Sequence, residues 1–305
     1  MAKYLIGDII RHWREQAGMT VNELAGNVVN ASTVWRIEQG YTLPSKDTME
    51  YLFQKLGIDP NDMCSTFFDS NMAEIQSITD KLDGYLTNHN SVEAGKLIAE
   101  LEQSESFMTN KFRTQYILAA KASMATSMDV NPSDVLEMYE KAISVAWGNY
   151  EEDQIASYFL SRIDFNILSG IAGNLSKLGN NEKAVFISQQ MLGNVKSNYL
   201  DKIEKGRRYP SIVYNLTNYL FDLERHSEVI ALCDEGKRVC IETEAYRLLP
   251  AIMANKAFSL LALGEKDKFF KLIDEVHKSY LLRDKHVEIE RIKDYAAKIG
   301  IVLDW

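Results

Sequence analysis

Apolar residues recur at helical spacing through almost the whole chain. Near the N-terminus, Leu5, Ile9, Ile10 and Trp13 follow this spacing and predict an amphipathic helix over residues 4–17. Alternating runs of β-branched residues, which indicate strands, are scarce. Five prolines and sixteen glycines are few for a chain of 305 residues. The sequence therefore predicts an all-α fold.

Residues 20–40 have the layout of two short helices joined by a tight turn. Thr20 and Glu23 are spaced as a capping box at the start of the first helix, which is expected to end near Gly26. Asn30 is placed to cap a second helix that runs to about residue 38 and stops before Gly40. This pattern is typical of a helix-turn-helix, which places its second helix in the major groove of DNA.

The second helix of this element has two faces with different chemistry. Val34 and Ile37 are expected to point inward, whereas Arg36 and two hydroxyl side chains lie outward, where they can reach base edges and phosphates. Three readings remain open. Trp35 can pack against the sugar-phosphate backbone or a neighbouring helix as well as against a base. Arg36 can form an ion pair with Glu23 instead of contacting DNA. Arg11, Arg14 and Lys46 can be solvated surface charges. The candidate DNA contacts are Ser32, Thr33, Trp35, Arg36, Arg11, Arg14 and Lys46.

The N-terminal block continues beyond this element. A fourth helix is predicted to begin at Pro44-Ser45 and end at Gly57, and a short fifth helix is predicted over residues 60–68. We therefore expect a five-helix domain over residues 1–69 and a second domain over residues 70–305.

Residues 1–56 contain six Lys/Arg and six Asp/Glu, so this segment is neutral, while the whole chain carries a net charge of −9. Because phosphate neutralisation supplies much of the affinity for duplex DNA, such a domain is expected to need dimerisation.

From residue 71 onward, one apolar row returns in three helices, at spacings of 45 and 40 residues. Helical hairpins that recur at about 34 to 47 residues are typical of an α-solenoid of the tetratricopeptide type. Two weaker units are expected over residues 72–105 and 111–145, and a capping helix is expected over residues 286–298. Only Lys256 breaks the pattern. The matching rows are Ile167, Ile171 and Leu175; Ile212, Leu216 and Leu220; and Ile252, Lys256 and Leu260.

A second stripe of small and carboxamide residues begins one position before each apolar row. We expect it to line the concave side of the superhelix, where carboxamides offer both donors and acceptors to an extended peptide backbone. The alternative is that these asparagines hydrogen-bond between adjacent repeats. The candidate peptide contacts are Arg162, Asn166, Ser211, Asn215, Asn218, Asn255 and Phe258.

The two halves together resemble the Rgg-type quorum-sensing regulators of Gram-positive bacteria. These belong to a wider group, with PlcR-like proteins, that joins an XRE-type helix-turn-helix to a C-terminal repeat domain. The residues that carry the resemblance are 20–25 (TVNELA), 32–40 (STVWRIEQG), Pro44 and 55–58 (KLGI). The resemblance implies a homodimer that binds an operator with two half-sites, and a short hydrophobic signalling peptide bound on the concave face of the repeats. Trp35 departs from the small polar residue usual at that position. The disulfide of some relatives is not carried over, because no cysteine precedes Cys64.

Other classes of function find little support in the sequence. A glycine-rich phosphate loop, a Gly-x-Ser-x-Gly elbow and a His/Cys/Asp cluster with usable spacing are all absent. Cys64, Cys233 and Cys240 lack metal-ligand spacing and indicate a reducing cytosol, with buried thiols expected for the last two. We expect a cytoplasmic transcription regulator that has no enzymatic activity, cofactor, metal or membrane association. Its expected partners are promoter DNA, a signalling peptide and a second copy of itself. The alternative is a repeat scaffold for a protein partner, with the helix-turn-helix as a docking or tethering module.

Overall fold

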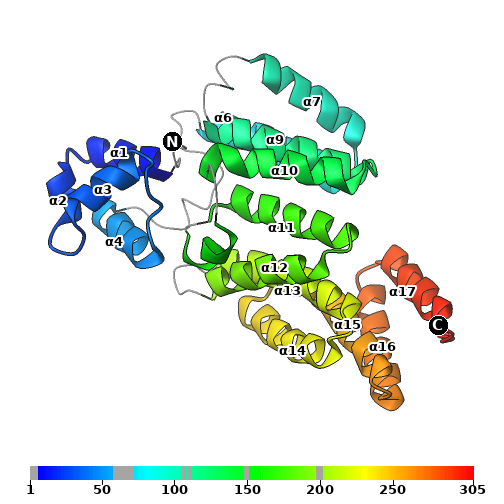
Figure 1. The fold of residues 1–305 in the computed structure, drawn as a ribbon. Coiled ribbons are helices and arrows are strands. Elements are labelled where there is room, and N and C mark those ends of the chain that lie inside the picture. Colours follow the sequence, from blue (N-terminus) through cyan, green and yellow to red (C-terminus); the bar gives the residue numbers. More distant parts are fainter. Residues whose placement is uncertain are drawn as a thin grey trace. The chain divides into compact units, whose positions relative to one another are not determined.

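The structure, a computed structural model, confirms the predicted all-α class. It describes residues 6–57, 72–104, 108, 111–147, 151–158, 160–196 and 202–305, and within these ranges it contains helices and no strands. The chain divides into two compact units, residues 1–204 and 205–305 (Figure 1). The domain boundary predicted at residue 69 and the predicted fifth helix both lie outside the described residues, and the boundary stays a prediction.

The N-terminal helices follow the predicted order. The first helix begins at residue 6 within the described residues and ends one residue earlier than expected. Ser45 caps the fourth helix, because its Oγ accepts a hydrogen bond from the amide of Thr48 at 3.3 Å. Gly57 ends that helix in the left-handed region, at φ 68°, where only glycine avoids a steric penalty. The helices are α1 (Ile6–Gln16), α2 (Val21–Ala25), α3 (Ala31–Glu38) and α4 (Lys46–Leu56).

The rest of the first unit consists of helical hairpins, which confirms the two weaker repeats predicted before residue 162. Figure 1 shows α9 and α10 side by side, and α10, α11 and α12 pack in sequence. The elements are α6 (Met72–Thr87), α7 (Ser91–Gln103), α9 (Lys111–Ser127), α10 (Pro132–Trp147), η1 (Glu152–Ser157), α11 (Arg162–Lys177) and α12 (Asn181–Val195).

Local polar contacts set the ends of these helices. Ser161 and Asp164 form a capping box at the start of α11. The amide of Ser161 donates to the Asp164 carboxylate at 2.9 Å, and the amide of Asp164 donates to the Ser161 hydroxyl at 3.2 Å. The fully buried Asn194 of α12 donates to the carbonyl oxygens of Ile155 and Tyr158, and so holds the short 3-10 helix η1 against α12. A buried carboxamide is retained here because it satisfies backbone acceptors that water cannot reach.

The second unit holds the last hairpins and the capping helix, which covers the predicted residues 286–298. The apolar rows predicted for this unit are buried. Lys256 breaks its row because its head group pairs with Asp234 at 2.5 Å, while its aliphatic stem is largely covered. The helices are α13 (Lys202–Asp222), α14 (His226–Thr243), α15 (Leu249–Ala262), α16 (Lys266–Leu281) and α17 (His286–Lys298).

The thiols of Cys233 and Cys240 are buried in the second unit, as predicted. Burial raises the pKa of Cys233 to about 12 and that of Cys240 to about 11, so both thiols are protonated at neutral pH. Cys64 lies outside the described residues. Among the described helices, none combines the length and the apolar run that a bilayer crossing requires. The described His, Cys, Asp and Glu side chains form no group of three that could hold a metal ion.

Candidate nucleic-acid interface and ligand pocket

The start of α2 has the predicted capping box. The amide of Glu23 donates to the Thr20 hydroxyl at 3.2 Å, and the amide of Thr20 donates to the Glu23 carboxylate at 2.7 Å. The hydrogen bond from the Thr20 backbone lowers the pKa of Glu23. These reciprocal bonds fix where α2 begins. Gly26 ends it at φ 55°, a conformation that allows the chain to turn toward α3.

Helix α3 presents one buried face and one exposed face. Val34 and Ile37 have no exposed surface, so they anchor the helix in the domain core. Ser32 and Arg36 are exposed, and Thr33 is partly exposed. Asn30 occupies the N-cap position, but the predicted side-chain cap is wrong. Its backbone carbonyl, not its carboxamide, receives the amide hydrogen bonds of the first turn.

A partly buried ion pair fixes the end of α3 against α1. The Arg14 guanidinium donates to both carboxylate oxygens of Glu38, at 2.6 Å and 2.9 Å, and to the carbonyl oxygen of Met19 at 2.9 Å. Glu38 is only 2% exposed. The hydrogen bond that Arg14 donates to Glu38 is the largest cause of the raised pKa of Arg14. A bidentate pair of this kind sets orientation as well as distance, so α1 positions the exposed face of α3.

An aromatic pair extends the exposed face beyond the end of α3. Trp35 is 48% exposed, and its ring centroid lies 5.7 Å from that of Tyr41, which is also exposed. The two rings present apolar edges beside the polar side chains of α3. Side chains of this type can contact a thymine methyl group or the deoxyribose.

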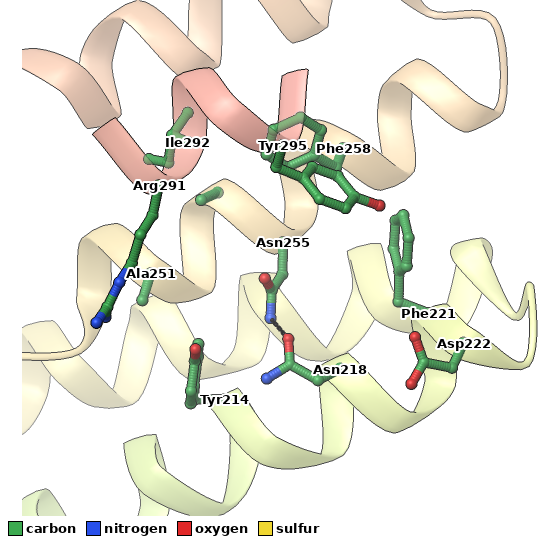
Figure 2. Close-up of a pocket in the computed structure, with 11 residues that line it drawn as sticks. Tyr214, Asn218, Phe221, Asp222, Ala251, Asn255, Phe258, Arg291, Ile292 and Tyr295 are labelled. Carbon is green, nitrogen blue, oxygen red and sulfur yellow. Dashed lines mark hydrogen bonds between the residues drawn. The ribbon is translucent and has the colours of Figure 1, made fainter. Parts of the chain in front are cut away.

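A pocket of about 380 Å³ lies in the second unit, between α13, α15 and α17 (Figure 2). Each helix contributes successive turns of one face, so the lining runs along the helices. Apolar and aromatic side chains form most of the walls, with a few polar groups among them, which is the usual composition of a ligand site. The lining residues are Tyr214, Asn218, Phe221, Asp222, Ala251, Ala254, Asn255, Phe258, Arg291, Ile292 and Tyr295.

Two asparagines meet on the wall between α13 and α15. The Asn255 amide nitrogen donates to the Asn218 side-chain oxygen at 2.8 Å and to the Thr217 hydroxyl at 2.9 Å (Figure 2). Both hydrogens of the Asn255 amide are therefore used. The Asn218 nitrogen and the Asn255 oxygen are not used in this pair, and they offer the pocket one donor group and one acceptor.

Aromatic rings close one end of the pocket. Tyr295 of α17 packs edge-on against Phe258 of α15, with ring centroids 4.7 Å apart. Phe258 in turn packs on Phe269 in the core of the last hairpin, at 5.5 Å. Burial raises the pKa of the Asp222 carboxyl beside this end. Burial also raises the pKa of Tyr295, with a smaller contribution from the charge of Asp222.

Comparisons with known proteins place these features in a wider context. Residues 5–63 match the family described as "Helix-turn-helix domain". In structure, the chain is similar to PlcR of Bacillus thuringiensis, solved in complex with the peptide PapR7 and DNA. The identity is 16%, the coverage is 94% of this chain and 98% of PlcR, and the TM-score is 0.60. The chain has the fold of PlcR. The resemblance predicted from the sequence is thus confirmed for the helix-turn-helix and for the fold.

Two further structures share this PlcR fold. ComR of Streptococcus thermophilus, solved in complex with DNA and its signalling peptide ComS, is 17% identical, with a TM-score of 0.55 over 97% of this chain and 100% of ComR. The SHP pheromone receptor Rgg2 of Streptococcus dysgalactiae is 13% identical, with a TM-score of 0.50 over 96% of this chain and 99% of Rgg2. None of the curated proteins matches the chain in sequence.

Most of the predicted DNA contacts lie on or beside the exposed face of the helix-turn-helix. Arg11 is partly exposed on α1, and the side chain of Lys46 lies outside the described part of the structure. Arg14 is the exception, because its guanidinium is engaged by Glu38 within the domain. Within the described residues, no ion pair or hydrogen bond joins Arg36 to Glu23, the alternative left open by the sequence.

The predicted peptide contacts of the PlcR-like repeats divide into two sets. Asn218, Asn255 and Phe258 come together in the pocket. Ser211 and Asn215 lie on α13 but do not line it. In the first unit, Asn166 is exposed and Arg162 lies 3.8 Å from Asp83, an ion pair within that unit. The hydrogen bond between Asn218 and Asn255 also matches the alternative reading, in which asparagines join adjacent repeats.

Sequence reasoning missed the contribution of α17 to the pocket. Arg291, Ile292 and Tyr295 line it, although the sequence predicted only a capping role for this helix. Arg291 and Ile292 are adjacent, and Tyr295 follows one turn later, so the three share one face of α17. The repeat alignment could not predict this face, because α17 has no counterpart in the other units. On α13, Tyr214 and Phe221 lie four residues before and three residues after Asn218, so they share its face of the helix.

Proposed function

We propose that this chain is a transcription regulator that binds promoter DNA through α3 as a homodimer. A short signalling peptide, bound in the repeat domain, controls that binding. The observation that carries the proposal is the exposed polar face of α3, anchored from behind by Val34 and Ile37, in a chain with the fold of PlcR and ComR. PlcR and ComR were each solved with DNA and a peptide, which supports both halves of the proposal.

In this proposal the side chains of the helix-turn-helix have separate roles. Arg36 contacts a base edge or phosphate in the major groove, and Ser32 and Thr33 donate to phosphates or bases nearby. Trp35 makes apolar contact with the sugar-phosphate backbone or a thymine methyl group. Arg14 acts indirectly, because its bond to Glu38 positions α3. Arg11 and Lys46 supply further positive charge for phosphates.

The neutral charge of the N-terminal segment is the reason to propose a homodimer. Residues 1–56 carry equal numbers of basic and acidic side chains, so one copy neutralises few phosphates. Two copies on an operator with two half-sites double the contacts at little further entropic cost. We propose that residues 1–69 form the DNA-binding domain and that residues 70–305 form the sensing and dimerisation domain. The protein then acts in the cytoplasm, where the DNA is, and has no catalytic role.

The Arg36→Ala variant is expected to bind the DNA upstream of its own gene about tenfold to a hundredfold more weakly, because one groove contact contributes roughly 1–3 kcal/mol. Fluorescence anisotropy with labelled duplex measures this change. Arg36 is exposed, so the variant should fold normally. Arg247→Ala, an exposed arginine of the second unit, is the matched control and should bind like the unaltered protein. Equal affinities for both variants would contradict the proposed role of α3.

A further inference from the structure

The pocket in the second unit has two chemically different ends. Tyr295 packs on Phe258, which places these rings together at one end. One helical turn before Tyr295 on α17 stands Arg291, and two turns before Phe258 on α15 stands Ala251. Figure 2 shows Arg291 and Ala251 on one side of the asparagine pair, with Phe258 and Tyr295 away from them.

Opposite charges mark the two ends. On α13, Tyr214 and Asp222 are eight residues apart, or roughly 12 Å along the helix axis. Figure 2 places Tyr214 on the side of Arg291 and Asp222 beside Phe221, on the far side of the asparagine pair. Among the described residues, neither the Arg291 guanidinium nor the Asp222 carboxylate has an ion-pair partner within 4.0 Å. The pocket therefore has a cationic end, and an aromatic end with an acidic side chain beside it.

The asparagine pair lies between these ends. Asn255 uses both amide hydrogens on Thr217 and Asn218, which orients the two carboxamides. The remaining groups are the Asn218 nitrogen, which donates, and the Asn255 oxygen, which accepts. A single peptide unit offers a carbonyl oxygen and an N–H, and so matches this wall.

We propose that this pocket binds the C-terminal residue of the signalling peptide, with its free carboxylate on Arg291 and a large apolar side chain against Phe258 and Tyr295. This inference deepens the proposed function and rests on it. Asp222 repels a carboxylate from the aromatic end, so the charges alone select one orientation of the ligand. The pocket volume of about 380 Å³ lies at the small end of the range of ligand sites, roughly 300–1,000 Å³, and suits the end of a peptide better than its whole length.

Capture from synthetic peptide pools tests this assignment. Two pools of random heptapeptides, one with free C-terminal carboxylates and one amidated, are passed over the immobilised full chain, and retained peptides are sequenced by mass spectrometry. We expect the free-acid pool to be enriched in Leu, Ile, Met, Phe, Tyr or Trp at the last position. We also expect retention about tenfold or more above the amidated pool, because a charge-assisted hydrogen bond is lost on amidation.

Two variants on the same helix sharpen the test. Arg291→Gln removes the proposed carboxylate partner, which is exposed, and should reduce retention of the free-acid pool to that of the amidated pool. Lys293→Gln is the matched control, because Lys293 is paired with Glu290 and does not line the pocket. It should keep the preference for the free acid.

Four outcomes would overturn the inference. If both pools are retained equally, or if the enriched apolar residue lies inside the peptide and not at its last position, the protein binds peptides but does not recognise their C-terminal carboxylate. Enrichment of Asp or Glu in the amidated pool would show that the carboxylate comes from a side chain. If the unaltered protein enriches no peptide at all, the inference fails together with peptide control in the proposed function. The DNA-binding half is measured separately with the Arg36→Ala variant.

Discussion

Gly7→Ala is expected to destabilise the N-terminal domain by about 1–3 kcal/mol or more, the usual cost of forcing extra volume into a packed interior. A methyl group at Gly7 would overlap the carbonyl oxygen of Ile37 and crowd the backbone of Glu38. Backbone atoms cannot move aside as the end of a flexible side chain can. To admit the methyl group, α1 must therefore shift away from α3, the proposed reading helix. Hydrogen exchange of the α3 amides, measured by mass spectrometry on the full chain, reports this loss directly.

Gly84→Ala is the matched control for this prediction. Gly84 is also within a helix, α6, but apart from its chain neighbours and the backbone of its own helix, no described atom lies within 4 Å of the position that a methyl group would take. The same substitution there should raise helix stability by about 0.5–1 kcal/mol, because glycine loses more conformational freedom on folding than alanine. If Gly7→Ala left the exchange of α3 unchanged while Gly84→Ala slowed exchange in α6, the close approach of α1 to α3 would be wrong.

Arg14→Met is expected to have the second large effect, a loss of about 3–5 kcal/mol in the local stability of the N-terminal domain. The substitution leaves the Glu38 carboxylate, 2% exposed, without its partner, and an unpaired buried charge is far more costly than a missing surface pair. The exchange rates of the α1 and α3 amides measure this loss. Binding to DNA should weaken in parallel, because α3 is no longer held in position.

Two further variants identify the cause of the Arg14→Met effect. The double variant Arg14→Met with Glu38→Leu removes both charges and should recover most of the lost stability. Glu15→Ala removes the other carboxylate near Arg14, which is 3.5 Å away and 61% exposed, and should change stability by less than about 1 kcal/mol. A double variant as unstable as Arg14→Met would mean that packing of the arginine, and not its charge, holds the two helices together.

Local signals in the sequence predicted the helix-turn-helix well. Thr20 and Glu23 are three residues apart, so their reciprocal hydrogen bonds depend only on short-range spacing. The pair formed by Arg14 and Glu38 spans 24 residues, and no local pattern links the two. Arg14 was therefore predicted as a DNA contact, and only the packing of α1 on α3 shows which carboxylate it meets.

The pocket was predicted in part, for a related reason. Asn218 and Asn255 lie on the same predicted stripe but at different positions of the repeat, because Asn255 aligns with Asn215. The alignment therefore predicted their shared face, whereas the hydrogen bond between them is seen only in the structure. Arg291 and Tyr295 belong to α17, which follows the last repeat and has no equivalent position to align. Asn166 shares the stripe but belongs to the first unit and is exposed, which the alignment did not indicate. Periodicity predicts which face of a helix is shared, whereas only the fold determines where along that face a cavity forms.

We propose that occupancy of the repeat-domain pocket controls DNA binding by α3. The most direct measurement is the affinity of the full chain for the DNA upstream of its own gene, at two or more salt concentrations, with and without a peptide captured from the free-acid pool. We predict that the affinity falls steeply as salt rises, and that the peptide changes it by about fivefold or more at fixed salt. An affinity that is the same for scrambled DNA, and that the peptide leaves unchanged, would contradict the account.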